Sequence, residues 1–134
     1  MASISAIEGI GRIYAQKLSE YGIKTVEDLL DQCGSRSGRQ KVSKDTAIDA
    51  SKLLNWVNKA DLFRIKGIST QYSDLLEAAG VDTVKELQHR NAANLLEKMR
   101  EVNRAKKLVR QVPALSQVES FVEQAKSLEP RVSH

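Results

Sequence analysis

The sequence is poor in the residues that build disulfides, metal centres and nucleophilic sites. Its 134 residues include one cysteine, Cys33, and two isolated histidines, His89 and His134. A single cysteine excludes an internal disulfide and suits a reducing compartment, so we expect a cytoplasmic protein. The cysteine and the histidines lack the spacing of metal ligands. We therefore predict no metal site and no cofactor.

Long apolar runs are missing as well. No run approaches the ~20 residues that cross a bilayer. The start of the chain, MASISAIEGI, has no basic region followed by an apolar block, so we expect neither a secretory signal nor membrane association. Hydrophobic residues still make up 41% of the chain, which is the content of a globular protein.

Signals for β-strands are weak and signals for helices recur. Aromatic residues make up only 4% of the chain, and we find no sustained alternation and no Asn-Gly hairpin. Apolar residues instead follow helical spacing, as in Tyr14, Leu18 and Tyr21 at i, i+4 and i+7. The sequence therefore predicts an all-α fold.

The chain contains an internal repeat. Residues 7–32, IEGIGRIYAQKLSEYGIKTVEDLLDQ, align without a gap to residues 65–90, IKGISTQYSDLLEAAGVDTVKELQHR, at an offset of 58. The aligned positions share nine identities: Ile7/Ile65, Gly9/Gly67, Ile10/Ile68, Tyr14/Tyr72, Leu18/Leu76, Gly22/Gly80, Thr25/Thr83, Val26/Val84 and Leu29/Leu87. A repeat fixes the architectural unit before any residue is given a role. The shared glycines, threonine and apolar residues indicate a duplicated scaffold, whereas the charges between them differ.

Each copy has the pattern of a helix, a tight glycine turn and a second helix. Gly22 and Gly80 stand where a helix C-cap adopts positive φ. Three residues later, Thr25 and Thr83 begin capping boxes, with Asp28 as the acidic partner in the first copy. Tyr14 and Tyr72 are interpreted as core residues rather than as stacking platforms for bases.

The repeat continues into a second half at a different offset. Ser51–Ala60 aligns with Ser116–Ala125 at an offset of 65, and both carry an apolar stripe that includes Trp56 or Phe121. The second copy thus gained about seven residues, within which lies a basic insertion. We predict two pseudo-symmetric units of about four short helices each, residues 1–60 and 61–134.

Three local expectations complete this division. Residues 34–38, GSRSG, have the composition of a flexible loop. Ser116–Glu119, behind Pro113, are expected to begin a helix. The C-terminal tail from Glu129 is expected to fray.

The most informative motif is Gly9-Ile10-Gly11-Arg12, directly before a helix. A glycine–hydrophobic–glycine turn at a helix N-terminus exposes several backbone N–H groups to one point, and glycine lets a ligand approach closely. The helix dipole adds partial positive charge, so the turn suits a phosphate oxygen. Ile10 would anchor the turn to the core, and Arg12 would add a charge contact.

These residues resemble the helix-hairpin-helix superfamily, whose signature is this turn between two short helices. The paired arrangement resembles the four-helix unit of two successive hairpins in many DNA repair and recombination proteins. A closer resemblance, carried by Ile65–Ile68, Tyr72–Gly80 and Trp56–Leu62, is to an uncharacterised bacterial family known only as a domain of unknown function. It covers nearly the whole chain and implies no activity, whereas the superfamily implies binding of duplex DNA phosphates without base readout.

The second copy of the turn departs from the pattern. It reads Gly67-Ile68-Ser69, so it loses the second glycine and the arginine, although Lys66 and the Ser69 hydroxyl offer partial replacements. In the later half of the first unit, the expected hairpin glycine is Ala47. The corresponding stretch of the second unit reads Val112-Pro113-Ala114. One of four candidate turns is therefore intact.

The basic residues are concentrated locally rather than overall. The net charge is +4, which permits an anionic partner without requiring one. Residues 98–110 are rich in cations, among them Arg100, Arg104, Lys106 and Lys107, with Glu101 as the opposing charge. Such a run is more often a solvated face than a binding surface, and both interpretations stay open.

Two functions remain. The first is a non-enzymatic module that binds duplex DNA through the first turn, with Lys66, Gly67 and Ser69 of the second turn as further contacts and the basic segment as general attraction. The second is a protein-interaction adaptor that kept the fold and lost DNA binding. Carboxylates such as Glu27 and Asp28 are explained by helix capping, and a glycosylase would need a further domain with a base pocket.

Overall fold

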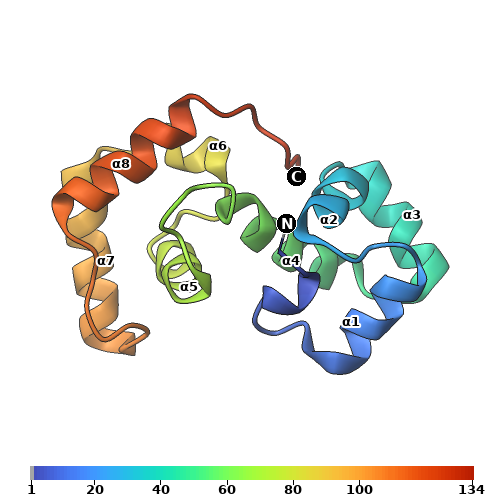
Figure 1. Ribbon diagram of the computed structural model, residues 1–134. Coiled ribbons are helices and arrows are strands. Elements are labelled where there is room, and N and C mark those ends of the chain that lie inside the picture. The colour runs from blue at the N-terminus through green and yellow to red at the C-terminus, as the bar shows by residue number, and fades with distance from the viewer. Residues whose placement is uncertain (1) are drawn as a thin grey trace. The chain divides into compact units, whose positions relative to one another are not determined.

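The computed structural model describes residues 2–134, and over these residues the protein is all-α. Eight α-helices and one short 3-10 helix follow one another along this part of the chain, without a strand (Figure 1). The nearest approach to sheet structure in residues 2–134 is an isolated bridge between Ser3 and Thr25. The predicted fold class is therefore confirmed.

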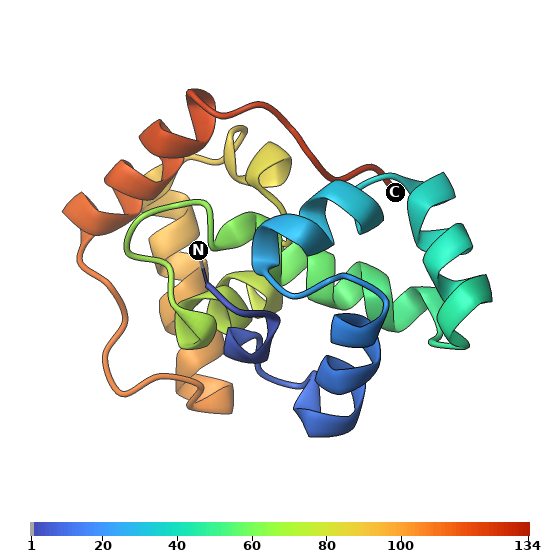
Figure 2. The ribbon, with the colours of Figure 1, turned by 45° about the vertical axis from the view of Figure 1, so that its right-hand side comes forward.

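The described chain forms two compact units. One comprises the residues up to Asp61 together with Arg131–His134, and the other comprises Leu62–Pro130. The chain thus passes from the first unit to the second and returns to the first for its last four residues. In Figures 1 and 2 the C-terminus accordingly lies beside the blue and cyan helices of the first unit.

Four α-helices and the 3-10 helix belong to the first unit. The elements are η1 (Ile4–Ala6), α1 (Gly11–Glu20), α2 (Val26–Cys33), α3 (Arg36–Thr46) and α4 (Ala50–Leu62), whose last residue already counts with the second unit. Helix α2 packs against α3, and η1 packs against α1. The core includes Leu18, Ile23, Leu29 and Leu53, all without exposed surface.

The second unit has four α-helices. They are α5 (Thr70–Ala78), α6 (Val84–Leu87), α7 (Ala92–Lys106) and α8 (Leu115–Lys126). Helix α8 packs along α7 and against α6, and α5 packs against α7. Leu75, Leu76, Leu87 and Val118 are fully buried members of one apolar core.

The glycine turns have the predicted conformation. Gly22 ends α1 with φ +99° and Gly80 ends α5 with φ +97°. The next residue closes each turn, since the N–H of Ile23 donates to the Leu18 carbonyl and that of Val81 donates to the Leu76 carbonyl, both at 2.8 Å. The left-handed glycine therefore sets the reversal between the two helices of each copy.

Both threonines cap their helices, but of the two predicted capping boxes the structure shows the first in full and only the threonine half of the second. The Thr25 hydroxyl accepts from the Asp28 N–H, and the Asp28 carboxylate accepts from the Thr25 N–H, which completes a capping box. Thr83 likewise accepts from the Glu86 N–H at 3.2 Å. The hydrogen bonds to the Asp28 carboxylate from the backbone N–H groups of Lys24 and Thr25 lower its pKa.

The prediction of a flexible loop at residues 34–38 is wrong. Ser35 caps α3, because its hydroxyl accepts from the Gly38 N–H at 3.0 Å, and α3 begins at Arg36. Gly38 lies in the first turn of α3, where an added Cβ would overlap the Gln32 carbonyl oxygen. Gly38 thus allows α3 to pack closely on the end of α2. Composition alone does not distinguish a glycine needed for close packing from one in a flexible loop.

Two further expectations differ from the structure. Helix α8 begins at Leu115 rather than at Ser116, because Ala114 is its N-cap residue and the Gln117 side chain accepts from the Ala114 N–H at 2.8 Å. The tail does not fray: Val132 is buried, and Ser133 bonds to the first unit through both of its backbone groups.

Candidate nucleic-acid interface

The first turn leads from the core to the surface. Ile7 and Ile10 are buried, with 1% and 2% of their surface exposed, whereas Gly9 and Gly11 between and after them are exposed. Both glycines have positive φ, +96° and +74°. A Cβ placed on either glycine would meet no described atom within 4 Å. The outer side of the turn is therefore open to a ligand.

The N-terminus of helix α1, which starts from this turn, has no side-chain cap among residues 2–134. Its N-cap residue is Ile10, in the helical conformation, so no side chain of the described residues caps the first turn. The dipole of α1 places partial positive charge there. Arg12 and Ile13 follow on the exposed surface, and Ile13 is 79% exposed. Glu8, also exposed, adds a negative charge to the start of this turn.

The second turn has the same φ at its first glycine but packs against α8 of its own unit. Gly67 has φ +97°, and Ile68 is buried like Ile10. Gln124 of α8 accepts from the Lys66 N–H at 2.9 Å and donates to the Lys66 carbonyl at 3.2 Å. A Cβ on Gly67 would come within 3.0 Å of the Phe121 ring. The side of this turn that approaches α8 is therefore filled.

Ser69 changes the start of α5 as well. Its extended backbone makes it the N-cap residue, and its hydroxyl accepts from the Tyr72 N–H at 3.5 Å. The glycine at the same place in the first turn, Gly11, has no side chain to do this. Substitution of the second glycine thus converts an open helix N-terminus into a capped one. The Lys66 side chain remains exposed beside it.

The predicted cations of the second unit lie at the C-terminal half of α7. Arg100, Arg104, Lys106 and Lys107 are all exposed. Arg100 pairs with Glu97 at 3.7 Å, one helical turn earlier. Arg104 and Lys106 occupy the last turn of α7, where cations stabilise the helix dipole, so they have a structural role without any ligand.

The C-terminus of α7 has an unusual backbone. Lys107 is its C-cap residue and adopts the left-handed conformation, with φ +51°. Asn103 then fixes the following chain, because its side chain donates to the Val109 carbonyl and accepts from the Val109 N–H, both at 3.0 Å. The predicted basic insertion is thus partly helix and partly an ordered connection.

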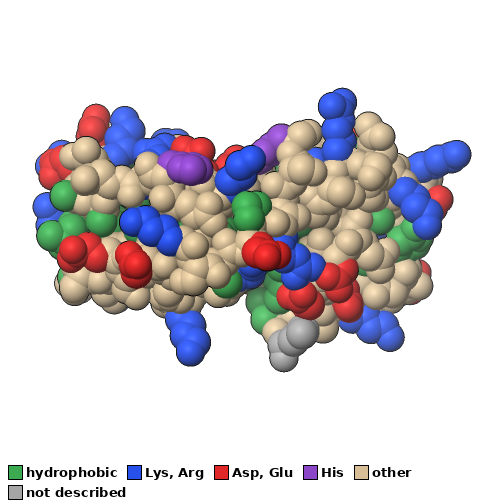
Figure 3. Space-filling view, turned by 90° about the horizontal axis from the view of Figure 1, so that it is seen from above, with side chains coloured by type: hydrophobic (Ala, Val, Ile, Leu, Met, Phe, Trp, Pro, Cys, Tyr) green, Lys and Arg blue, Asp and Glu red, His purple; other side chains and the backbone are tan. Residues whose placement is uncertain are grey.

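The structure groups the predicted residues by unit. Gly9, Ile10, Gly11 and Arg12 lie together in the first unit, and the remaining predicted residues, Lys66, Gly67, Ser69, Arg100, Arg104, Lys106 and Lys107, lie in the second. On the face drawn in Figure 3, lysine and arginine side chains are scattered among aspartate and glutamate rather than gathered in one patch. Among the predicted residues, the first turn is the feature with the geometry for an anion.

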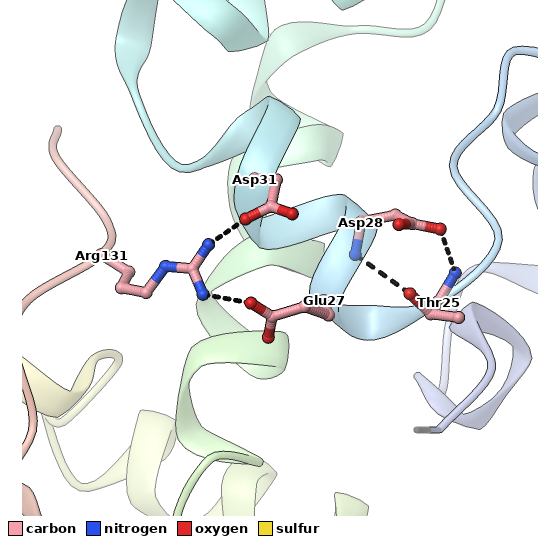
Figure 4. A network of polar contacts seen from close by, with 5 residues as sticks. All are labelled: Thr25, Glu27, Asp28, Asp31 and Arg131. Carbon is pink, nitrogen blue, oxygen red and sulfur yellow. Dashed lines mark hydrogen bonds and ion pairs between the residues drawn. The ribbon is translucent and has the colours of Figure 1, made fainter.

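Sequence reasoning missed a polar network in the first unit (Figure 4). The Arg131 guanidinium pairs with the carboxylates of Glu27 and Asp31 on α2. The hydrogen bond to Glu27 raises the pKa of Arg131 further. Glu27 and Asp31 are one helical turn apart, which is the spacing for a shared cation, but nothing in the sequence identified a partner about 100 residues away.

The described residues hold one buried thiol and no cluster of metal-binding side chains. Cys33 is fully buried, and burial raises the pKa of its thiol to about 11, so it stays protonated near neutral pH. Across residues 2–134, histidine, cysteine and acidic side chains do not cluster in threes as a metal ion would need. No described helix has both the length and the apolar character to cross a membrane.

The comparisons with known proteins identify a family. The chain belongs to the family described as Domain of unknown function (DUF4332), whose sequence profile matches residues 8–128. The match includes both turns, all eight α-helices and the basic segment. No curated protein and no solved structure matches the chain.

Proposed function

We propose that the protein is a non-enzymatic module of helix-hairpin-helix type that binds backbone phosphates of duplex DNA through its first turn. The open turn at Gly9–Arg12 carries this proposal. It combines exposed glycine backbone, an uncapped helix N-terminus and an adjacent arginine. These are the elements that hold a phosphate oxygen elsewhere in proteins.

The assignment to this type is supported by the agreement between the two copies. Gly9 and Gly67 have nearly the same φ, as do Gly22 and Gly80. Ala47, at the expected hairpin glycine of the later half of the first unit, also adopts a left-handed conformation, with φ +62°. We propose on this ground that the two units are pseudo-symmetric copies of one duplicated hairpin scaffold.

Each residue of the first turn has a distinct role in the proposal. Ile10 anchors the turn in the core, and the backbone N–H groups after it donate to a phosphate oxygen. Arg12 adds a contact to the same or the neighbouring phosphate. Neither contact carries base information, so binding is independent of sequence. The single buried thiol, Cys33, suits the cytoplasm that we propose for this activity.

A salt titration tests the proposal. Duplex DNA, single-stranded DNA and RNA of several sequences are titrated with the protein at increasing salt. Because one turn neutralises few phosphates, log K should fall against log salt with a slope of about −1 to −2 for duplex DNA. The expected affinity is that of non-specific binding, with a Kd of about 10⁻⁴ to 10⁻⁶ M.

Two substitutions of opposite sign sharpen this test. Arg12→Glu should weaken binding to all sequences alike, and Glu8→Gln should tighten it, because Glu8 is the exposed carboxylate at the turn. Lys17→Glu on α1 is the matched control, since it changes the charge as much as Arg12→Glu does but lies outside the turn. If wild-type protein leaves duplex DNA unbound at low salt, the proposal is wrong.

A protein-interaction adaptor is the second candidate, and the closed second turn favours it. Gln124 accepts from the Lys66 N–H and Ser69 accepts from the Tyr72 N–H, so two backbone donors at the second turn are already engaged within its own unit. A fold with one ligand turn already closed can serve as a scaffold. The adaptor predicts no DNA binding and no effect of Glu8→Gln.

A further inference from the structure

The last four residues of the chain are held as an extended peptide by the first unit. Ser133 donates its N–H to the Gly34 carbonyl at 2.9 Å and accepts at its carbonyl from the Arg39 guanidinium at 2.5 Å. Val132, the residue before Ser133, is 6% exposed. Both backbone groups of one residue and the side chain of its neighbour are thus bound, which is how a recognition site holds a peptide.

The surface that receives this segment is shaped for it. Arg39 is 3% exposed and also donates to the carbonyls of Cys33 and Gly34, at 3.0 and 2.9 Å, so its guanidinium is fixed in place. Gly34 is buried, and an added Cβ would overlap the Arg131 carbonyl oxygen. A larger residue at position 34 would therefore displace the bound segment.

At the first residue of the segment, Arg131, the contact with the first unit is made by charge. Arg131 pairs with both Glu27 and Asp31, and its side chain is 29% exposed (Figure 4). A guanidinium can meet two carboxylates at once because its donors form a fixed fork. The site therefore favours a segment with arginine at the first position, an aliphatic residue at the second and, at the third, any residue whose backbone N–H can donate.

We propose that this surface of α2 and α3 is a peptide-binding site that the chain's own tail occupies, and that the same segment of a second copy can replace it. If the tail left the site, Arg39 would lose the Ser133 carbonyl and the Gly34 carbonyl would lose the Ser133 N–H, while the Arg39 bonds to Cys33 and Gly34 would stay. The site therefore keeps its shape and can accept another copy of the segment. The same segment of a second copy can make every one of these contacts, so exchange between copies changes the free energy of the contact little.

The sequence between the second unit and this segment suits exchange. Only Glu129 and Pro130, both exposed and outside any helix, separate Leu128 from Arg131. The tail of the same chain nonetheless has the advantage, because a short tether keeps its local concentration at about the millimolar level. The wild-type protein should thus be monomeric in dilute solution.

A charge-exchange experiment isolates replacement by a second copy. The first variant, Glu27→Gln/Asp31→Lys, has an altered site and a normal tail. The second, Arg131→Glu, has a normal site and an altered tail. Within each variant the charges at this contact repel, and across the mixture they attract. Native mass spectrometry should show monomers for each variant alone and mixed dimers for the mixture, with dimerisation on the order of tenfold tighter than for either variant.

Two controls keep the result interpretable. The chain with all three substitutions restores opposite charges within one copy and should again be monomeric. A labelled peptide with the sequence of residues 128–134 should bind the Arg131→Glu variant, whose site is intact, and an otherwise identical peptide with the arginine replaced by glutamate should not. A mixture that stays monomeric overturns replacement by a second copy, and an Arg131→Glu variant that leaves the peptide unbound overturns the peptide-binding site itself.

Discussion

The ring of Tyr14 packs against the ring of Trp56, with centroids 5.2 Å apart and planes tilted by 56°. Tyr72 and Phe121 make the same kind of contact in the second unit, at 6.4 Å and 57°. The first members of the two pairs are related by the repeat offset of 58 residues and the second members by that of 65. Both units thus contain the same kind of aromatic contact between the two halves of the sequence repeat, although the offsets of the halves differ.

Trp56 should be a major source of stability. It is 5% exposed on α4, and removal of a buried ring leaves a cavity as well as a loss of apolar burial. Trp56→Ala should lower the free energy of unfolding by about 3–5 kcal/mol, measured by urea denaturation. Asn55→Ala, at the exposed neighbouring position, should change it by less than about 0.5 kcal/mol. An unchanged stability for Trp56→Ala would place the ring outside the core.

Much of the scaffold was predictable because its signals are local. The spacing of apolar residues gave an all-α fold, and Gly22 and Gly80 gave two helix ends, since each signal acts within one or two turns. Residues 34–38 were not predictable from composition, because Gly38 is required by the approach of α3 to α2 rather than by flexibility. That approach is a tertiary contact.

Two positions with positive φ should respond in opposite directions. Gly22 has φ +99° with no described atom within 4 Å of an added Cβ, so Gly22→Ala tests the backbone alone. It should cost more than about 1 kcal/mol. Ala47 already bears the strain of φ +62°, so Ala47→Gly should stabilise the protein by up to about 1 kcal/mol. Thermal unfolding measures both, and destabilisation by Ala47→Gly would show that the left-handed conformation is not strained here.

The capping box should make stability depend on acid pH. The hydrogen bonds that the Asp28 carboxylate accepts from the backbone N–H groups of Lys24 and Thr25 lower its pKa from the ordinary value of 3.8, so the folded state favours the carboxylate. This contribution is fully present above the pKa of the unfolded chain and is lost as pH falls through the lower folded pKa. Asp28→Ala should therefore destabilise the protein near neutral pH, and the difference from wild type should shrink below pH 3.8. Urea denaturation at several pH values measures this difference, and a constant difference would contradict it.

The candidate site was only partly predictable, for a physical reason. The Gly-Ile-Gly-Arg motif located the first turn, because glycine and helix start are adjacent in sequence. The closure of the second turn depends on Gln124, 58 residues from Lys66, and no local pattern marks it. The contacts of the tail with Glu27 and Asp31 span about 100 residues, so no local pattern marks them. The prediction that the tail frays was wrong for this reason.

The difference between the two turns is the central claim, and backbone amide shifts measure it most directly. ¹⁵N-labelled protein is titrated with a short DNA duplex at low salt, and the amide signals of Gly9–Ile13 are followed beside those of Lys66–Thr70. Saturable shifts at Gly11, Arg12 and Ile13, with little change at Gly67 and Ser69, would agree with an open first turn and a closed second one. Shifts at the second turn alone, or none at either, would contradict the proposed phosphate site.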